Sequence, residues 1–226
     1  MTFPDSQKPA EASPPLNRWW AMIPAAGLSR RMGAPKLLLP YRGTTILGKL
    51  FEGLRTAGVE SVAVVTRPDD LALQSEVLRL GGELLIPSAD PPDMRDSVEF
   101  GLSELEARHH PHPREGWILI PADHPLLSPE TLLKLFSEWE RISPEVLVPT
   151  WRGKRGHPAL LRWDLRRLIP QIPPEWGLNW ILRRSGIHVA ELELDDPLIL
   201  EDLDTPEDYE RLCRNDGGAS TSGQSF

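Results

Sequence analysis

Residues 19–37 read WWAMIPAAGLSRRMGAPKL and join an apolar, strand-like run to a cationic loop that contains glycines. Gly27 and Gly33 allow tight turns of positive φ, in which backbone N–H groups converge on an anion. Arg31 and Lys36 supply charge-assisted hydrogen bonds to phosphate oxygens. The spacing G-x-x-x-R-x-G-x-x-K matches neither the Walker loop nor the motif G-x-G-x-x-G. The stretch therefore predicts a strand followed by a phosphate-binding loop of another kind.

The composition predicts one compact domain. With 226 residues, 40% of them hydrophobic, the chain can bury one substantial core, and its length fits one domain better than two. The formal net charge of −8 argues against broad contact with nucleic acid or with an anionic membrane. A single cysteine excludes an internal disulfide framework and favours a reducing compartment, so we expect a cytoplasmic protein.

Both ends of the chain have the composition of disordered tails. Residues 1–17 are rich in proline and polar side chains, residues 215–226 are rich in glycine, serine and threonine, and the domain is expected between them at 18–214. The apolar run at 19–28 has some likeness to a signal-peptide core, but cleavage behind it would delete the first strand and split the phosphate loop. No run reaches the roughly 18 apolar residues of a membrane helix. We therefore expect neither secretion nor a membrane span.

Between the tails, runs typical of strands alternate with runs typical of helices. This alternation builds βαβ units and predicts a parallel sheet. Thr44 is the candidate N-cap of the first helix, Gly58 stands where that helix should end, and the chain from Pro149 through His157 is expected to be a loop. Strands are expected at 19–25, 59–66, 83–86, 116–123, 145–149 and 188–194, and helical stretches at 44–57, 69–80, 96–107, 128–141, 163–168, 175–184 and 206–214.

The loop at 24–37 resembles the signature of the MobA/MocA-like nucleotidyltransferases, which act on the α-phosphate of a nucleoside triphosphate (NTP). Further motifs similar to those of this family follow at 93–102, 121–126, 153–158 and 201–209. The resemblance implies a three-layer αβα sandwich in a single domain, with a Rossmann-like, mostly parallel sheet of the nucleotide-diphospho-sugar transferase kind. It also implies transfer of a nucleoside monophosphate to a phosphorylated acceptor, with release of pyrophosphate.

Two aspartates are the metal ligands that this resemblance implies. Asp123 ends a buried strand, at the rim where open α/β sheets bind their ligands. With Asp204 it is expected to hold Mg²⁺, a hard ion that takes carboxylate and phosphate oxygens. Either aspartate has an alternative as a helix cap, although Ser128 is better placed to cap the helix after Asp123. Asp202 is the reserve candidate for the second ligand.

The resemblance also implies which residues bind the nucleotide. Lys36 and Arg31 would neutralise the phosphates and, with Asp123, form the catalytic set. Ser97 opens a segment similar to the family's M-x-x-S-x-x-x-G-L motif, with an alternative as a helix cap. The expected nucleotide-binding residues are Ala25, Ala26, Gly27, Ser29, Arg31, Met32, Gly33, Lys36 and Ser97.

The acceptor is expected at residues 153–158, which match the family's G-x-x-G-H-P loop and place Arg155, Gly156 and His157 at a second phosphorylated substrate. An ordinary solvent-exposed turn is the alternative. The sequence Ala-Ala-Gly at 25–27 is more similar to the cytidylyltransferase branch than to the guanylyl branch, so CTP is favoured over GTP. The acceptor implied is molybdopterin, with transient contact to proteins of molybdoenzyme maturation.

Two alternatives remain open at this point. Residues 175–180, EWGLNW, depart from the family pattern, so a sugar phosphate or another phosphorylated metabolite stands as an alternative acceptor. A nucleotide-binding regulatory protein without turnover is the alternative from another class. The complete set of Lys36, Asp123 and Asp204 favours the enzyme, because a protein that only binds nucleotide does not need all three.

Overall fold

One mixed sheet forms the centre of the protein. A computed structural model of the chain describes residues 18–27 and 31–217. Its eight-stranded sheet has the order β10-β7-β9-β6-β1-β4-β5, with β8 paired to β7, and β2 and β3 form a separate two-stranded ribbon. The strands are β1 (Trp19–Pro24), β2 (Pro40–Tyr41), β3 (Thr44–Thr45), β4 (Ser61–Val65), β5 (Glu83–Leu85), β6 (Gly116–Leu119), β7 (Val146–Trp151), β8 (Lys154–Arg155), β9 (Ala159–Arg162) and β10 (Val189–Glu193).

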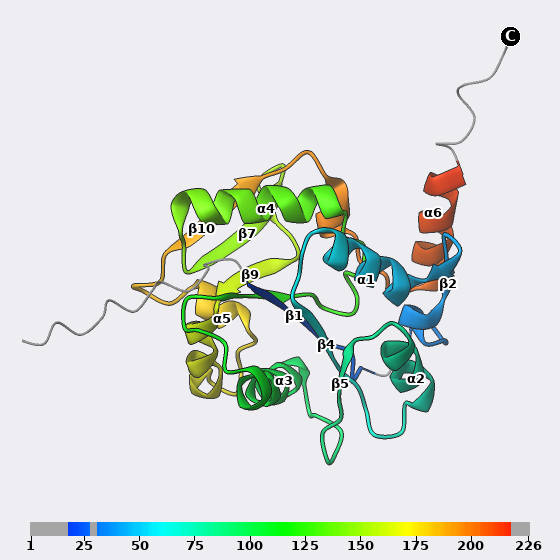
Figure 1. The fold of residues 1–226 in the computed structure, drawn as a ribbon. Helices are drawn as coiled ribbons and strands as arrows, with labels where there is room; N and C mark the ends of the chain where they lie inside the picture. Colours follow the sequence, from blue (N-terminus) through cyan, green and yellow to red (C-terminus); the bar gives the residue numbers. More distant parts are fainter. Residues whose placement is uncertain (1–17, 28–30, 218–226) are drawn as a thin grey trace, which may run out of the picture.

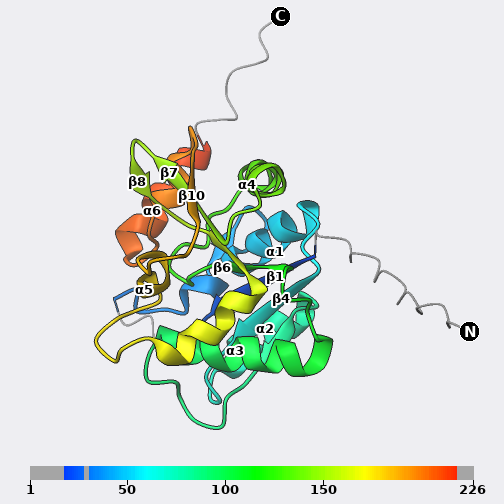
Figure 2. The ribbon, with the colours of Figure 1, turned by 90° about the vertical axis from the view of Figure 1, so that its left-hand side faces the viewer.

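Helices cover both faces of this sheet. The α-helices are α1 (Ile46–Thr56), α2 (Leu71–Arg79), α3 (Met94–His109), α4 (Pro129–Ile142), α5 (Asn179–Leu182) and α6 (Pro206–Gly217), and the 3₁₀ helices are η1 (Lys36–Leu38), η2 (Trp163–Gln171) and η3 (Pro197–Leu200). Figure 1 shows α1 and α4 on one side of the sheet and α3 on the other, and Figure 2 shows η2 beside α3. In the ranges described, no helix is long and apolar enough to cross a bilayer.

The central strand β1 links the two halves of the core. All six of its residues are buried, and it pairs in parallel with β4 and β6. Because successive side chains of a strand point to opposite faces, Ala21 and Ile23 pack in the cluster that includes α1, α2 and α4, whereas Trp20 and Met22 pack with α3 and η2. A strand covered on both faces is apolar along its whole length. The predicted three-layer αβα sandwich with a mostly parallel sheet is confirmed.

The N-cap of the first helix lies one residue later than predicted. The Thr45 hydroxyl, not that of Thr44, accepts a hydrogen bond from the Gly48 N–H at 2.9 Å, although both threonines belong to β3. The helix ends where expected, because Gly58 adopts a φ of +83° and donates its N–H to the carbonyl of Arg55.

The largest departure from the sequence prediction lies between residues 149 and 188. The expected loop contains β8 and β9, and β9 runs antiparallel to both of its neighbours, β6 and β7. The expected helix at 175–184 shrinks to the four residues of α5, and the helical stretch at 163–168 is a longer 3₁₀ helix. At the end of the chain α6 extends to Gly217, so residues 215–217 of the tail predicted at 215–226 are helical. Residues 1–17 and 218–226 lie outside the described residues.

Candidate functional site

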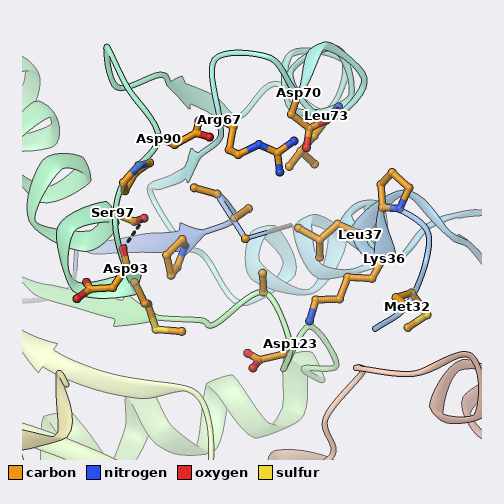
Figure 3. Close-up of a pocket in the computed structure, with 18 of the residues that line it drawn as sticks. Met32, Lys36, Leu37, Arg67, Asp70, Leu73, Asp90, Asp93, Ser97 and Asp123 are labelled. Atoms are coloured by element: carbon orange, nitrogen blue, oxygen red, sulfur yellow. Dashed lines mark hydrogen bonds between the residues drawn. The ribbon is translucent and has the colours of Figure 1, made fainter. Parts of the chain in front are cut away.

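A cavity of about 510 Å³ opens at the carboxyl ends of β1, β4 and β6, the three adjacent strands at the middle of the sheet. Its size falls in the range of small-molecule sites, and its place follows the rule for open α/β sheets. Figure 3 shows Lys36 and Asp123 on one side of the cavity, with Arg67 and Asp90 on the other. The lining comprises Pro24, Ala25, Ala26, Gly27, Arg31, Met32, Pro35, Lys36, Leu37, Arg67, Asp70, Leu73, Asp90, Pro91, Pro92, Asp93, Met94, Ser97, Ala122, Asp123 and Asp204.

The loop after β1 forms one wall, and buried apolar side chains anchor it. The Ala25 N–H donates to the carbonyl of Val65 at 2.8 Å, while Met32 and Leu37 are buried in the core. Gly33 has the predicted positive φ, at +67°, but Gly27 does not lie in the left-handed region, contrary to the expectation for both glycines. Ser29 lies outside the described residues.

Two cations of this loop meet a single carboxylate. Lys36 Nζ lies 3.2 Å from Asp204 Oδ1, and Arg31 Nη2 lies 2.8 Å from Asp204 Oδ2. The Lys36 side chain is only 11% exposed and that of Asp204 20%, whereas the Arg31 side chain is 74% exposed. Lys36 is therefore a partly buried cation of the cavity, whereas Arg31 contacts the same carboxylate from a largely exposed position.

The second carboxylate is held beside the first through the backbone. The Leu203 N–H donates to the carbonyl of Asp123 at 2.7 Å, which joins the segment after β6 to the one that carries Asp204. Asp123 Oδ1 is buried and has no hydrogen-bond partner in the described part of the chain. A buried carboxylate oxygen without a donor is costly unless a ligand or cation approaches it.

These carboxylates suit a hard divalent cation only in combination with a substrate. Within residues 18–27 and 31–217, no group of three or more His, Cys, Asp or Glu side chains is arranged to hold a metal ion. Mg²⁺ usually binds through one or two carboxylates and completes its coordination with water and substrate phosphates. Asp123 and Asp204, which line the same cavity as Lys36, fit that requirement.

Asp202, the reserve metal ligand, has a partner of its own. Its Oδ1 lies 2.8 Å from Nε2 of His124, and its side chain is 56% exposed. The ring of His124 in turn lies 4.3 Å from the ring of His157. Burial, with a contribution from His124, lowers the pKa of His157 to about 4, so this imidazole is neutral at pH 7. The two histidines therefore form a packed pair behind Asp123.

The predicted acceptor loop does not reach the cavity. The described residues that line the cavity include neither Arg155 nor Gly156. Arg155 Nη2 lies 2.6 Å from Glu191 Oε1 across the edge of the sheet. A Cβ at Gly156 would lie 2.4 Å from the carbonyl oxygen of Ile199, so this glycine permits a close approach of two backbones. His157 does not line the cavity either, but the charge of Asp123, which does, acts on the pKa of His157.

Ser97 lies in the cavity wall but does not cap its helix. It is buried, and its hydroxyl donates to the carbonyl of Asp93 at 3.1 Å. The Asp93 side chain is the cap, because it accepts from the Asp96 N–H at 3.0 Å. The sequence prediction missed Arg67 and Asp90, which also line the cavity. Arg67 follows β4 as Asp123 follows β6, so the strand-end rule contained the signal for it.

Comparison with known proteins supplies the family. The protein-family model described as "MobA-like NTP transferase domain" matches residues 21–189, well over half of the chain. The chain belongs to the MobA-like NTP transferase family. It is accordingly a nucleotidyltransferase, and other solved nucleotidyltransferases share its fold.

Curated relatives of this family member use different acceptors. It is 30% identical over 193 residues to "Phosphoenolpyruvate guanylyltransferase" of Mycolicibacterium gilvum, a match that covers 84% of this chain and 85% of the relative. It is 25% identical over 189 residues to "Molybdenum cofactor cytidylyltransferase" of Escherichia coli, with coverage of 83% and 92%. Both names describe nucleotidyl transfer, but they differ in the base of the nucleotide and in the acceptor.

A solved structure associates manganese with a chain that is similar to this one. Rv0371c of Mycobacterium tuberculosis, in complex with manganese, is 26% identical to this chain, with a TM-score of 0.66. The match covers 87% of this chain and 98% of that one. The metal belongs to that protein, and it agrees with the chemistry of the two cavity carboxylates described above.

Proposed function

We propose that this MobA-like NTP transferase moves a nucleoside monophosphate from an NTP, with CTP favoured, to a terminal phosphate of molybdopterin, in the presence of Mg²⁺. The observation that carries the proposal is the meeting of Lys36, Asp123 and Asp204 in one cavity at the carboxyl ends of the central strands. The likeness to a molybdenum cofactor cytidylyltransferase supports the acceptor. The reaction takes place in the cytoplasm, and its product passes to proteins of molybdoenzyme maturation.

The reaction is an in-line displacement at the α-phosphorus. An oxygen of the acceptor phosphate forms a bond to the α-phosphorus, the bond from this phosphorus to the bridging α–β oxygen breaks, and pyrophosphate leaves with that oxygen. No covalent intermediate with the enzyme is required, because the main contributions are positioning and charge stabilisation. The chain therefore needs cations and N–H donors around the triphosphate rather than a nucleophile.

The residues of the cavity have distinct roles in this mechanism. Lys36 neutralises phosphate charge from a partly buried position, where electrostatic interactions are stronger than in water. Arg31 adds a second, solvent-exposed cation, and the backbone N–H groups of the described loop residues Ala26, Gly27 and Gly33 would add further donors. Asp123 and Asp204 would hold the metal ion. When bound, this ion supplies positive charge next to the triphosphate and so favours departure of pyrophosphate.

The adjoining wall of the cavity suits the nucleoside. Ser97, Asp90 and Arg67 lie on the side away from Lys36 and offer both donors and acceptors to a base or ribose.

A sugar phosphate or another phosphorylated metabolite is the alternative acceptor, because relatives of similar identity carry different acceptors in their names.

The test is pyrophosphate release with CTP, GTP, ATP and UTP, each offered with Mg²⁺ and molybdopterin. Release with CTP that requires molybdopterin is the expected result. Release with GTP alone would assign the guanylyl branch. Binding of nucleotide without release from any of the four would contradict molybdopterin as the acceptor.

A further inference from the structure

The two cations proposed to bind the triphosphate already share an anion that belongs to the protein. Arg31 Nη2 contacts one oxygen of Asp204 at 2.8 Å, and Lys36 Nζ contacts the other at 3.2 Å. The loop of Lys36 and the segment of Asp204 lie 168 residues apart in the sequence. Without nucleotide, Asp204 thus occupies the hydrogen-bonding groups that phosphate oxygens would use.

Lys36 and Arg31 cannot serve the triphosphate fully while they remain bound to Asp204. If they turn to the phosphates, the Asp204 carboxylate, only 20% exposed, loses both charged partners. A partly buried carboxylate without a partner is strongly unfavourable, and here it would also face the negative charge of the nucleotide. Asp123, whose Oδ1 has no hydrogen-bond partner among the residues described, adds a second negative charge to the same cavity.

A divalent cation that arrives with the nucleotide removes this penalty. When bound, such an ion would give Asp204 a partner in place of Lys36 and Arg31, and it would reduce the charge of the triphosphate. We propose that Asp204 makes this site select the metal-bound nucleotide over free nucleotide, because Asp204 competes with the phosphates for Lys36 and Arg31 until a metal ion takes their place. This inference rests on the proposed function and adds to it the form of the nucleotide that the site accepts.

The proposal has an unusual consequence for a residue expected to bind metal. Removal of the Asp204 charge should strengthen the binding of metal-free nucleotide, since it frees two cations at once. Loss of a residue that only binds metal would weaken nucleotide binding in Mg²⁺ and would free no cation when the metal is absent. Affinity in the presence of a chelator therefore separates the two roles of Asp204.

The experiment is calorimetric titration of CTP into the full chain, in excess EDTA and separately in Mg²⁺, for wild type, Asp204→Asn and Asp202→Asn. Asp202→Asn is the matched control, because it removes the same charge two residues away from a side chain that pairs with His124 instead. In EDTA, Asp204→Asn should bind CTP about tenfold more tightly than wild type, the effect of releasing two ion pairs of which one is partly buried. Asp202→Asn should stay within about twofold of wild type, since it releases neither cation.

Asp204→Ala is measured in parallel, and thermal unfolding establishes that each variant is folded. If Asp204→Asn and Asp204→Ala bind metal-free CTP no more tightly than wild type does, Asp204 does not compete with the phosphates and the inference is wrong. An equal gain in Asp202→Asn would reduce the effect to net charge and would also overturn it. The proposed function has a separate readout, because wild type that binds neither CTP in Mg²⁺ nor GTP, ATP or UTP titrated in the same way would contradict nucleotide binding itself.

Discussion

Replacement of Lys36 by methionine should reduce catalysis far more than the same change at Arg31. Both side chains contact Asp204 and line the cavity, but the Lys36 side chain is 11% exposed and the Arg31 side chain 74% exposed. Two unit charges 4 Å apart interact by about 4 kcal/mol at an effective dielectric of about 20, and by about 1 kcal/mol in water. The interaction of Lys36 with a phosphate should lie nearer the first energy, and that of Arg31 nearer the second.

This difference of roughly 3 kcal/mol corresponds to about 10²-fold in rate. We expect Lys36→Met to lower kcat/KM by about 10²- to 10³-fold, the usual loss of one preorganised electrostatic contact, and Arg31→Met to lower it by about three- to tenfold. The assay is steady-state pyrophosphate release with CTP, Mg²⁺ and the acceptor, with circular dichroism as the control for folding. A loss in Arg31→Met equal to or larger than that in Lys36→Met would refute the assignment of Lys36 as the main phosphate ligand.

Three further predictions concern the second carboxylate, the histidine pair and the tight loop. Asp123→Asn should abolish transfer yet leave the melting temperature within a few degrees of wild type, since its Oδ1 has no described partner; retained activity would remove it from the site. His157 is held neutral with a pKa of about 4, below its ordinary value of 6.5, so its contribution to stability is complete above pH 6.5 and is lost as the pH falls toward 4. In denaturant titrations with EDTA, the free energy of unfolding of wild type should fall by up to about 3 kcal/mol more than that of His157→Gln over this pH range. Parallel plots of this free energy against pH for the two proteins would exclude the effect. Gly156→Ala should destabilise the chain by about 1–3 kcal/mol, because the new Cβ meets the backbone of Ile199, and an unchanged denaturation midpoint would contradict that close approach.

The sequence predicted the centre of the fold and the rim of the site because their signals are local. The continuous apolar run of β1 identifies a strand buried on both faces. Asp123 follows the apolar strand β6, and parallel strands bring their carboxyl ends to one edge of the sheet. Residues from the first loop and from the end of β6 were therefore expected to meet, and they line one cavity.

The missed elements carry weak local signals. Strand β9 has only four residues, ALLR, and a short apolar run does not distinguish a strand from the start of a helix. Its antiparallel direction depends on its pairing with β6 and β7, which the local pattern does not contain. The local pattern also could not distinguish Thr44 from Thr45 as N-cap, because adjacent threonines offer the same capping hydroxyl.

Pairings between distant side chains were beyond prediction from spacing. The contact of Asp204 with Lys36 joins residues at opposite ends of the domain. Asp202 pairs with His124 whereas Asp204 lines the cavity, although both acids stand in the same short motif. Arg155 has the charge expected of an acceptor-binding residue, but its partner Glu191 on β10 directs it to the edge of the sheet.

The most direct test of the central claim uses CTP labelled on its α-phosphate, in the presence of Mg²⁺ and molybdopterin, and follows where the label goes. The account predicts that the label moves to the acceptor and that unlabelled pyrophosphate is released in equal amount. If the label instead remains in a nucleoside diphosphate and inorganic phosphate is released, the chain breaks the β–γ bond, and its assignment as a nucleotidyltransferase is contradicted.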